Sequence, residues 1–426
     1  MAATFAAQGK AMGEQGIWVL GGARTDFARN VAREGLGIDD LVAEVVHAAI
    51  DEAGIASTDL GSVHVANAFG QLFTGQGHLG AMPATVDESL WGLPATRHEA
   101  ACASGSVAVL AAMAELEAGR VDASLVVGVE VERNVAGDVA AQHLGAASWV
   151  GHEGAPRFVW PDAFDRIAQE YDHRYGLDDA HLRAFAELAF RNARTDPDAQ
   201  TRTWRIDEAS LSDDDAANPV VAGRLRRHDC SQITDGAAAV VLVSDRWRRA
   251  HPGRPVGARR ETTSTARVAG WGHRTVGLPL ARKLERSADD SHVLPHVRDA
   301  FADALGRAGL GTVDDLDLVE VHDCFTPSGY LAIDHLGITG PGESWKAIEG
   351  GDLERSGRMP VNPGGGLIGG GHPVGATGVR MLLDAARQVT ASAGPTQVDG
   401  ARRAGTLNIG GSTATVCSFV VEGVGA

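Results

Sequence analysis

The chain has 426 residues, which is long enough for two or three domain-sized units with sizeable cores. Its formal net charge of −17 argues against nucleic acid or an anionic membrane surface as a partner, although a local basic patch can still bind a phosphate-bearing molecule. No apolar stretch is long enough to predict a membrane span, and the polar N-terminus MAATFAAQGKAMGEQG lacks the apolar core of a secretory signal. The chain contains four cysteines without zinc-site spacing, Cys102, Cys230, Cys324 and Cys417. We therefore expect a reduced, cytoplasmic protein with no metal site.

The first half of the chain begins with a helix pattern, IDDLVAEVVHAAIDEAG at 38–54, followed by a strand pattern, SVHVANAF at 62–69. Apolar residues recur at helical spacing in the former and alternate in the latter. The glycine that ends the helix is a typical C-terminal stop. The pattern DGAAAVVLVSD at 235–245 predicts a buried strand that closes this half.

The same order returns in the second half. The helix pattern VLPHVRDAFADALGRAG at 293–309 precedes the strand pattern LVEVHDCF at 318–325, and STATVCSFVVEG at 412–423 predicts a closing strand. With one inserted residue, 53–69 and 308–325 share seven identical positions. We therefore predict two similar α/β halves with helices packed on sheets. We place these halves at 15–250 and 251–426, and expect a charged, helical loop domain inserted at about 133–224.

Cys102 follows a predicted strand and precedes an apolar helix pattern in HEAACASGSVAVLAAMAELEAG at 98–119. A thiol at a helix N-terminus meets unsatisfied N–H groups and the positive end of the helix dipole. We therefore expect a lowered pKa for Cys102 and a favoured thiolate, which makes this residue a candidate nucleophile. The alternative is a buried, inert cysteine, which is the usual state of a free cysteine.

His372 lies between two glycine clusters in NPGGGLIGGGHPVGATGVRM at 362–381. Such glycine density is unfavourable inside a helix or strand, but it suits backbone that passes close to a ligand. An imidazole on a tight Gly-Pro turn is well placed as a base for a nearby thiol. The alternative is a glycine-rich surface loop with an incidental histidine.

The tripeptide His-Asp-Cys occurs twice, at 228–230 and at 322–324. In the second copy, strand alternation places His322 and Cys324 on one face and directs Asp323 elsewhere. The first copy precedes the strand that closes the first half, so we expect Cys230 to be structural. A Gly-Gly-Ser turn at 410–412 separates two predicted strands and can present free backbone N–H groups to a developing oxyanion.

These segments together resemble the thiolase superfamily over nearly the whole chain. CASG resembles the nucleophile loop of that family, NPGGGLIGGGHPVGATG resembles its glycine-histidine signature, and NIGGS stands where many thiolases have Cys-x-Gly-Gly-Gly. Thiolases usually carry Asn-Glu-Ala-Phe at 322–325 and a second catalytic cysteine at the position of Asn408. This chain instead has His-Asp-Cys-Phe, and so resembles the sterol-carrier-protein type of thiolase, which uses the cysteine of that motif.

The resemblance implies an α/β thiolase fold, with a duplicated five-layered α/β/α/β/α core and an inserted loop domain. It also implies acyl-CoA or 3-ketoacyl-CoA substrates, coenzyme A as co-substrate with no permanently bound cofactor, and a homodimer or homotetramer.

The resemblance further implies the catalytic residues Cys102, His322, Cys324 and His372. His372 would take the proton of Cys102, which attacks the thioester carbonyl of a 3-ketoacyl-CoA, with an oxyanion hole around the two histidines. Carbon–carbon cleavage would leave an acyl group on Cys102 and an enolate, which Cys324 would protonate to acetyl-CoA. Free CoA would then take the acyl group while the N–H groups of Cys102 and Gly411 hold the second oxyanion. The reverse direction is Claisen condensation.

Other functions stay open at this stage. Ketosynthases share the fold but lack a second cysteine, so Cys324 argues against them; related aldolases typically lack the nucleophile, so Cys102 argues against those. A non-catalytic CoA- or lipid-binding protein is disfavoured because all four presumed catalytic side chains are present. The sequence leaves open the acyl chain length, and whether the role lies in degradation by β-oxidation or in biosynthesis. An acyl tunnel or ordinary core would account equally for the aromatic residues Trp149, Phe158, Trp160 and Phe164.

Overall fold

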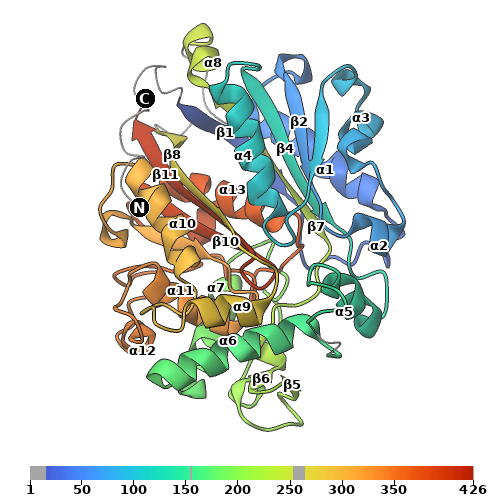
Figure 1. The fold of residues 1–426 in the computed structure, drawn as a ribbon. Helices are drawn as coiled ribbons and strands as arrows, with labels where there is room; N and C mark the ends of the chain where they lie inside the picture. The colour runs from blue at the N-terminus through green and yellow to red at the C-terminus, as the bar shows by residue number, and fades with distance from the viewer. Residues whose placement is uncertain (1–15, 154–155, 253–263, 426) are drawn as a thin grey trace.

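The computed structural model describes residues 16–153, 156–252 and 264–425 of the chain, so the predicted N-terminal tail, residues 1–15, lies outside the described residues. The described strands form one large sheet of nine, in the order β3-β2-β4-β7-β1-β8-β11-β10-β9, and a separate pair, β5-β6 (Figure 1). The first half supplies β1 (Ile17–Arg24), β2 (Ser62–Ala66), β3 (Ala95–His98), β4 (Ala123–Glu130) and β7 (Gly236–Ser244). The second half supplies β8 (Ser264–Thr275), β9 (Leu318–Val321), β10 (Arg403–Gly410) and β11 (Thr415–Gly425).

The two groups of strands join at a short contact between β1 and β8. Only three antiparallel residue pairs connect these strands, from Ile17 with Val268 to Val19 with Ala266. Within the first group, β4 pairs parallel with β2 but antiparallel with β7. The sheet is therefore mixed, and the predicted α/β fold class is confirmed.

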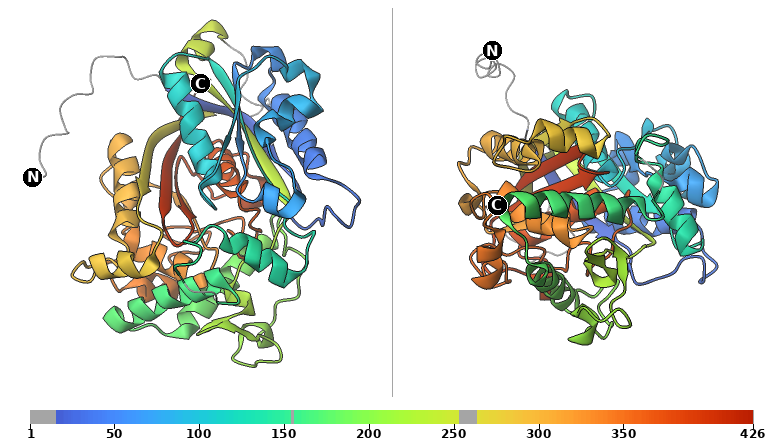
Figure 2. Two further views of the ribbon diagram at one scale, coloured as in Figure 1. Left: turned by 45° about the vertical axis from the view of Figure 1, so that its right-hand side comes forward. Right: turned by 60° about the horizontal axis from the view of Figure 1, so that its bottom comes forward.

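Helices lie on both sides of each group of strands, as expected for a five-layered core (Figure 2). The central layer consists of α4 (Ser104–Glu117) and α13 (Thr377–Val389), whose apolar side chains pack against strands of both groups. The outer layers are α1 (Ile38–Ala53) on the first group and α10 (Pro295–Arg307) on the second. Alternation along β7 serves two layers, since Ala239 and Val241 pack on the side of α1 while Ala238 and Val240 pack on the side of α4 and α13.

Close contact between α4 and α13 brings their N-terminal ends together. A Cβ atom added to Gly105 would lie 2.7 Å from the backbone nitrogen of Val379 and 2.9 Å from that of Gly378. Only glycine fits at this crossing, since any larger residue would force the helices apart. Cys102 precedes the first of these helices and His372 precedes the second, so the crossing fixes their separation.

A further layer of helices lies below the strand ends in Figures 1 and 2. Between β4 and β7, the chain forms α5 (Gly137–Gly145), α6 (Val159–Tyr175), α7 (Asp179–Ala193) and the pair β5 (Val220–Ala222) and β6 (Leu225–Arg226). The second half adds α9 (Leu280–Arg286), α11 (Thr326–His335) and α12 (Ser344–Glu349). Shorter helices are α2 (Gly70–Thr74), α3 (Met82–Val86) and α8 (Asp245–Ala250). The domain boundaries given above stay a prediction.

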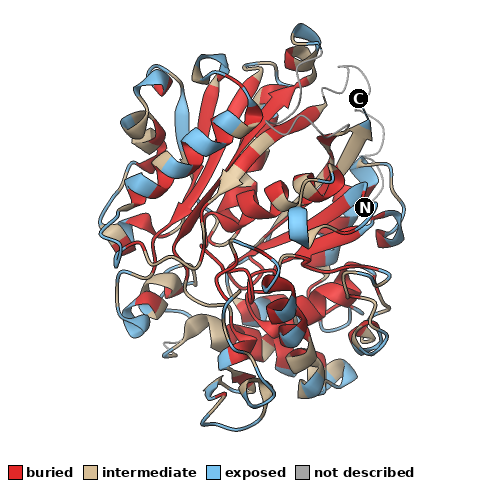
Figure 3. Cartoon of the chain, turned by 180° about the vertical axis from the view of Figure 1, so that it is seen from behind, coloured by how far each residue is buried: buried red, intermediate tan, exposed pale blue. Residues whose placement is uncertain are grey.

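Burial follows this arrangement. Strands β2, β4, β7, β9 and β10 and helix α13 are almost entirely buried, whereas exposed residues gather on the edge strand β3, the peripheral helices and the loops (Figure 3). Across the described ranges, no helix has both the length and the hydropathy that crossing a bilayer requires.

Candidate active site

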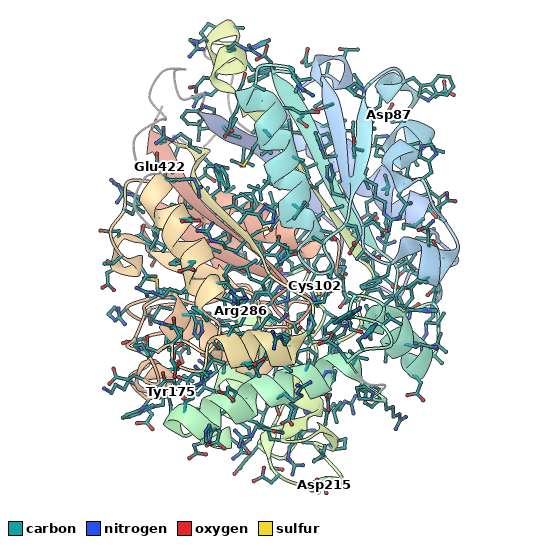
Figure 4. All side chains as sticks on the ribbon, viewed as in Figure 1. Asp87, Cys102, Tyr175, Asp215, Arg286 and Glu422 are labelled. Atoms are coloured by element: carbon teal, nitrogen blue, oxygen red, sulfur yellow. The ribbon has the colours of Figure 1, made fainter. Side chains whose placement is uncertain are left out.

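The structure brings the four predicted side chains to one place, where strand ends meet the helices below them. One ligand-type atom from each of Cys102, His322 and His372 lies within 4.8 Å of the other two. The two imidazole rings are nearly perpendicular, with centroids 5.1 Å apart. Cys324 lines the same cavity as Cys102 and His372. Figure 4 shows Cys102 close to the middle of the molecule.

Cys102 lies in a tight turn just before α4. Ala101 has a left-handed backbone (φ 51°), and Ser104 closes the turn by accepting a bond from Ala100 N at 2.9 Å and donating one to Ala101 O at 2.6 Å. The thiol sulfur accepts hydrogen bonds from the backbone N–H groups of Gly411 and of Cys102 itself, and both hydrogen bonds lower the pKa of Cys102.

The prediction of a lowered pKa for Cys102 is nevertheless wrong. Burial is the largest effect on this thiol, and the negative charge of Glu132 acts in the same direction, so that together they raise its pKa to about 12. The helix terminus and the two N–H groups do not outweigh these effects. The residue in the free protein is therefore a neutral thiol, which could act as a nucleophile only with a base beside it.

His372 is held as a neutral imidazole with one free acceptor. Its Nδ1 lies 2.7 Å from Thr377 Oγ1, whose hydroxyl donates to Pro373 O at 3.0 Å. Since the hydroxyl proton is used, Oγ1 must accept, and the ring proton is on Nδ1. The buried Nε2 has no hydrogen-bond partner among the described residues. Burial and the charge of Arg380 lower the pKa of His372 to about 3, so Nε2 carries a lone pair.

His322 has the opposite tautomer because of Asn408. The Asn408 Nδ2 group donates to Cys102 O at 3.1 Å and lies 3.0 Å from His322 Nδ1, while its Oδ1 accepts from Ser106 Oγ at 2.8 Å. A carbonyl only accepts, so this amide orientation is fixed and His322 Nδ1 must be an acceptor. The proton is therefore on Nε2. Burial lowers the pKa of His322 well below its usual range, so the ring is neutral.

The tautomer of His322 affects whether the cluster of Cys102, His322 and His372 can bind a metal ion. The atoms of Cys102, His322 and His372 are close enough for a shared ion. A metal on His322 Nε2 would require the proton to move to Nδ1, where it would face the amide protons of Asn408. The arrangement thus suits hydrogen bonding to a substrate oxygen better than metal ligation.

Cys324 follows β9, which ends at Val321, whereas the strand pattern predicted from the sequence continues to residue 325. Its thiol lies 3.7 Å from Ser328 Oγ, and burial together with the nearby Cys102 raises its pKa well above the usual range. Cys324 therefore keeps its proton. Asp323 points away from the thiols, since its Oδ1 accepts a bond from Leu367 N at 2.7 Å.

The thiols open into an apolar cavity of about 540 Å³. Of the four aromatic side chains considered from the sequence, Phe158, Trp160 and Phe164 line it, whereas Trp149 is 44% exposed and stacks on His152. A second, more polar cavity of about 740 Å³ adjoins the first, and the two share the lining residues Phe69, Ala101, Ala147 and Gly411. The site therefore has room for a substrate with one apolar and one polar portion.

Sequence reasoning missed three residues that shape the site. Thr377 and Asn408 set the histidine tautomers, and the buried Glu132 lines the cavity. Asn408 carried a signal, because it is a polar residue inside a strongly apolar strand pattern. Glu132 carried none, since its proximity to Cys102 depends on tertiary folding.

A fold of this kind, with two cysteines and two histidines gathered at the ends of its buried helices and strands, defines a cysteine-dependent enzyme of the acyl-transfer class. The chain belongs to the thiolase family. The profile described as "Thiolase, N-terminal domain" matches residues 17–246, and "Thiolase C-terminal domain-like" matches residues 282–423.

Several relatives resemble nearly the whole chain. An acetyl-CoA acetyltransferase of Methanothermobacter thermautotrophicus is 34% identical over 381 residues, covering 89% of this chain and 93% of the relative. A protein of the same description from Methanocaldococcus jannaschii is 27% identical over 415 residues, covering 95% and 98%. Sterol carrier protein 2 of Gallus gallus is 26% identical over 427 residues, covering 96% of this chain and 72% of the relative.

Solved structures share the fold. The Ltp2-ChsH2(DUF35) aldolase superposes with a TM-score of 0.73 at 21% identity, covering 96% of this chain and 98% of the other. The Acat5 thiolase of Ascaris suum in complex with coenzyme A gives a TM-score of 0.68 at 17% identity, covering 96% and 100%.

Proposed function

We propose that this protein is a thiolase that cleaves 3-ketoacyl-CoA with coenzyme A to acetyl-CoA and a shortened acyl-CoA, or catalyses the reverse condensation. The observation that carries the proposal is the buried Nε2 of His372, which lies beside the thiol of Cys102 and has no hydrogen-bond partner in the described part of the chain. A neutral thiol next to a neutral imidazole is a nucleophile with its base in reach.

In the first stage, Cys102 Sγ attacks the 3-keto carbonyl carbon, which is the β carbon, while His372 Nε2 takes the thiol proton. Attack at the thioester carbonyl, as expected from the sequence, would instead expel coenzyme A and leave the bond between the α and β carbons intact. The imidazolium that forms is stabilised by the Nδ1–H bond to Thr377, which strengthens as the ring becomes charged. The Nε2–H group of His322, which lies beside Cys102 and His372, is the proposed donor to the oxygen that becomes negative. Asn408 supports this donor by holding the His322 tautomer.

In the second stage, the bond between the α and β carbons breaks, and the electron pair leaves as an enolate. Cys324 supplies the proton that converts the enolate to acetyl-CoA, and its raised pKa keeps that proton available. The Cys324 thiolate then takes the proton of the coenzyme A thiol, whose sulfur attacks the acyl carbonyl on Cys102 while the N–H groups of Cys102 and Gly411 hold the oxyanion. The bond between the acyl carbon and Cys102 Sγ breaks, and the His372 imidazolium returns its proton to that sulfur. In the reverse reaction, which is a Claisen condensation, Cys324 accepts the α-proton.

The same proposal includes the finer predictions made from the sequence. The His-Asp-Cys-Phe motif and the similarity to sterol carrier protein 2 support a thiolase that uses Cys324 in place of a cysteine at Asn408. The apolar cavity beside the thiols supports an acyl group larger than acetyl. We also propose a cytoplasmic homodimer or homotetramer that acts in lipid metabolism, such as β-oxidation, with coenzyme A as co-substrate and no permanently bound cofactor.

Covalent labelling tests this function. Incubation with isotopically labelled acyl-CoA should add one acyl group to Cys102, detected by peptide mass spectrometry, and Cys102→Ala should abolish it. Cys324→Ala should retain the acyl-enzyme but lose cleavage of 3-ketoacyl-CoA. Cys230→Ser is the control, because that thiol donates to Arg226 O at 3.4 Å and takes no step in the proposed reaction, and its turnover should stay within about twofold. Labelling of Cys102→Ala would refute the nucleophile, and loss of acylation in Cys324→Ala would refute the second role.

A further inference from the structure

Lys283 is a buried cation that no catalytic step described above uses. It belongs to α9 and is only 7% exposed. Its Nζ donates to the backbone oxygen of Ser412 and, at 2.9 Å, to the Oγ of the same residue. A buried ammonium is rare unless its partners are well placed, so the double bond to one residue is a specific arrangement.

Ser412 lies in the turn between β10 and β11, directly after Gly411. Both Gly411 (φ 60°) and Thr413 (φ 64°) have left-handed backbones, a conformation that a threonine adopts only when its surroundings enforce it. His296 of α10 makes a second polar contact with this turn, since its Nε2 lies 3.0 Å from Thr413 O. Side chains from two separate helices therefore fix this turn.

The position of this turn decides where one oxyanion donor lies. The N–H of Gly411 faces the thiol of Cys102, and the residue that follows it is the one that Lys283 holds. Many thiolases have a glycine where this chain has Ser412, and a glycine offers no side-chain oxygen to a cation. The pair of Lys283 and Ser412 thus gives this turn an anchor that depends on a positive charge.

The charge on Lys283 responds to its surroundings. Burial lowers its pKa to about 8, and the carboxylate of Glu153 opposes part of that effect. Glu153 also accepts a bond from the N–H of Leu280 at the start of α9, at 2.9 Å. The other titratable group nearby is His296, whose pKa is lowered to about 4, so it is neutral. The ammonium is therefore mostly charged at pH 7 and loses its charge as the pH rises through about 8.

We propose that Lys283 is a positioning residue for acyl transfer, which holds the Gly411 N–H against the reacting thioester by anchoring Ser412. The inference rests on the proposed thiolase function, because it concerns the second oxyanion of that reaction. Lys283 itself does not line either cavity beside the thiols, so it acts through the turn rather than on substrate.

The test compares Lys283→Met with Ser412→Ala and with Lys346→Met, a matched lysine control in α12 that is half exposed. The measurement is the rate constant for transfer of the acyl group from Cys102 to coenzyme A in a single turnover, between pH 6.5 and 9.5. Calorimetry gives the Kd for coenzyme A.

At pH 7 the Lys283→Met transfer rate should fall by roughly 10- to 100-fold, since a misplaced oxyanion donor has that effect. The Kd for coenzyme A should change by less than about threefold, because Lys283 does not line the cavities. The wild-type rate should decline as the pH rises through about 8, and that decline should vanish in Lys283→Met. Ser412→Ala should slow transfer less, and the double variant should be no slower than Lys283→Met alone.

A Lys283→Met transfer rate within twofold of wild type, or an unchanged pH profile in that variant, would overturn the inference while leaving the thiolase function standing. A wild-type chain that forms no acyl-enzyme would overturn the thiolase function, and this role with it. Slow transfer in Lys346→Met would also count against the inference, because that lysine is far from the turn in sequence and carries an ordinary surface ion pair.

Discussion

Replacing Thr377 by valine should slow the acylation of Cys102 while leaving the shape of the site almost unchanged. Valine matches threonine in size but removes the hydroxyl that accepts the Nδ1–H of His372 at 2.7 Å and donates to Pro373 O at 3.0 Å. The Nδ1 proton would then have no acceptor in a fully buried position. The preference for the tautomer with a free Nε2 would weaken as well.

The expected size of the effect follows from the charge that develops on the ring. A neutral hydrogen bond contributes about 1 kcal/mol, and a bond from the imidazolium contributes about twice that. Losing the difference raises the barrier by about 1 kcal/mol, and the weaker tautomer preference adds a few tenths more. The acylation rate should therefore fall by roughly 5- to 30-fold. The free energy of unfolding should fall by about 1–3 kcal/mol, since a buried donor is left unsatisfied.

Rapid-quench mass spectrometry measures acylation directly, and Thr377→Ser is the matched control because serine keeps the hydroxyl. The serine variant should acylate within about threefold of wild type. If the valine variant is folded and acylates as fast as the serine variant, Thr377 does not set the tautomer of His372. The assignment of His372 Nε2 as the base would then lose its structural support.

Three further outcomes are expected. The rate at which iodoacetamide alkylates Cys102 should keep rising between pH 7 and 10. The pKa of Cys102 is raised to about 12, and the reactive thiolate forms only as the pH approaches that value. A plateau in the rate below pH 8 would contradict this. Asn408→Asp replaces an amide donor by an oxygen beside His322, so carbon–carbon cleavage should fall by about a hundredfold in steady-state assays, more than acylation does. Arg380→Met should lower the free energy of unfolding, measured in urea, by about 3 kcal/mol. In the wild-type protein the Arg380 guanidinium lies 2.9 Å from the buried carboxylate of Glu320, and the substitution leaves that carboxylate without its partner; a change below 1 kcal/mol would contradict this.

The sequence predicted the elements whose signals are local. The helix expected over 38–54 is α1, and Gly54 ends it with a left-handed backbone of φ 64°, as a C-terminal glycine does. The apolar helix pattern expected directly after Cys102 is α4, which begins at Ser104. Both signals depend on residues within one or two helical turns, so no tertiary information was needed to find them.

The end of β9 shows where local signals fail. The alternating pattern continues to Cys324, but the strand stops at Val321 because the side chain of Asn362 pairs with that residue as a strand would. Its Oδ1 accepts from Val321 N at 2.7 Å, and its Nδ2 donates to Val321 O at 3.2 Å. Asn362 is 41 residues away in the chain, so periodicity within the strand carries no sign of it. The pKa of Cys102 was mispredicted for the same reason, because the helix terminus is local whereas burial and Glu132 are not.

The two His-Asp-Cys copies show how position decides the use of identical residues. They lie side by side in the fold, since Cys230 forms an isolated bridge with Phe325 and Ser231 N donates to Cys324 O at 2.8 Å. Asp229 of the first copy accepts a bond from Thr326 Oγ1 at 2.9 Å, at the first residue of α11. The first copy thus supports the backbone on which Cys324 sits. Of the two cysteines, Cys324 alone has Cys102 as a close enough neighbour to affect its pKa. This supports our proposal that the second copy carries the chemistry while the first supports its backbone.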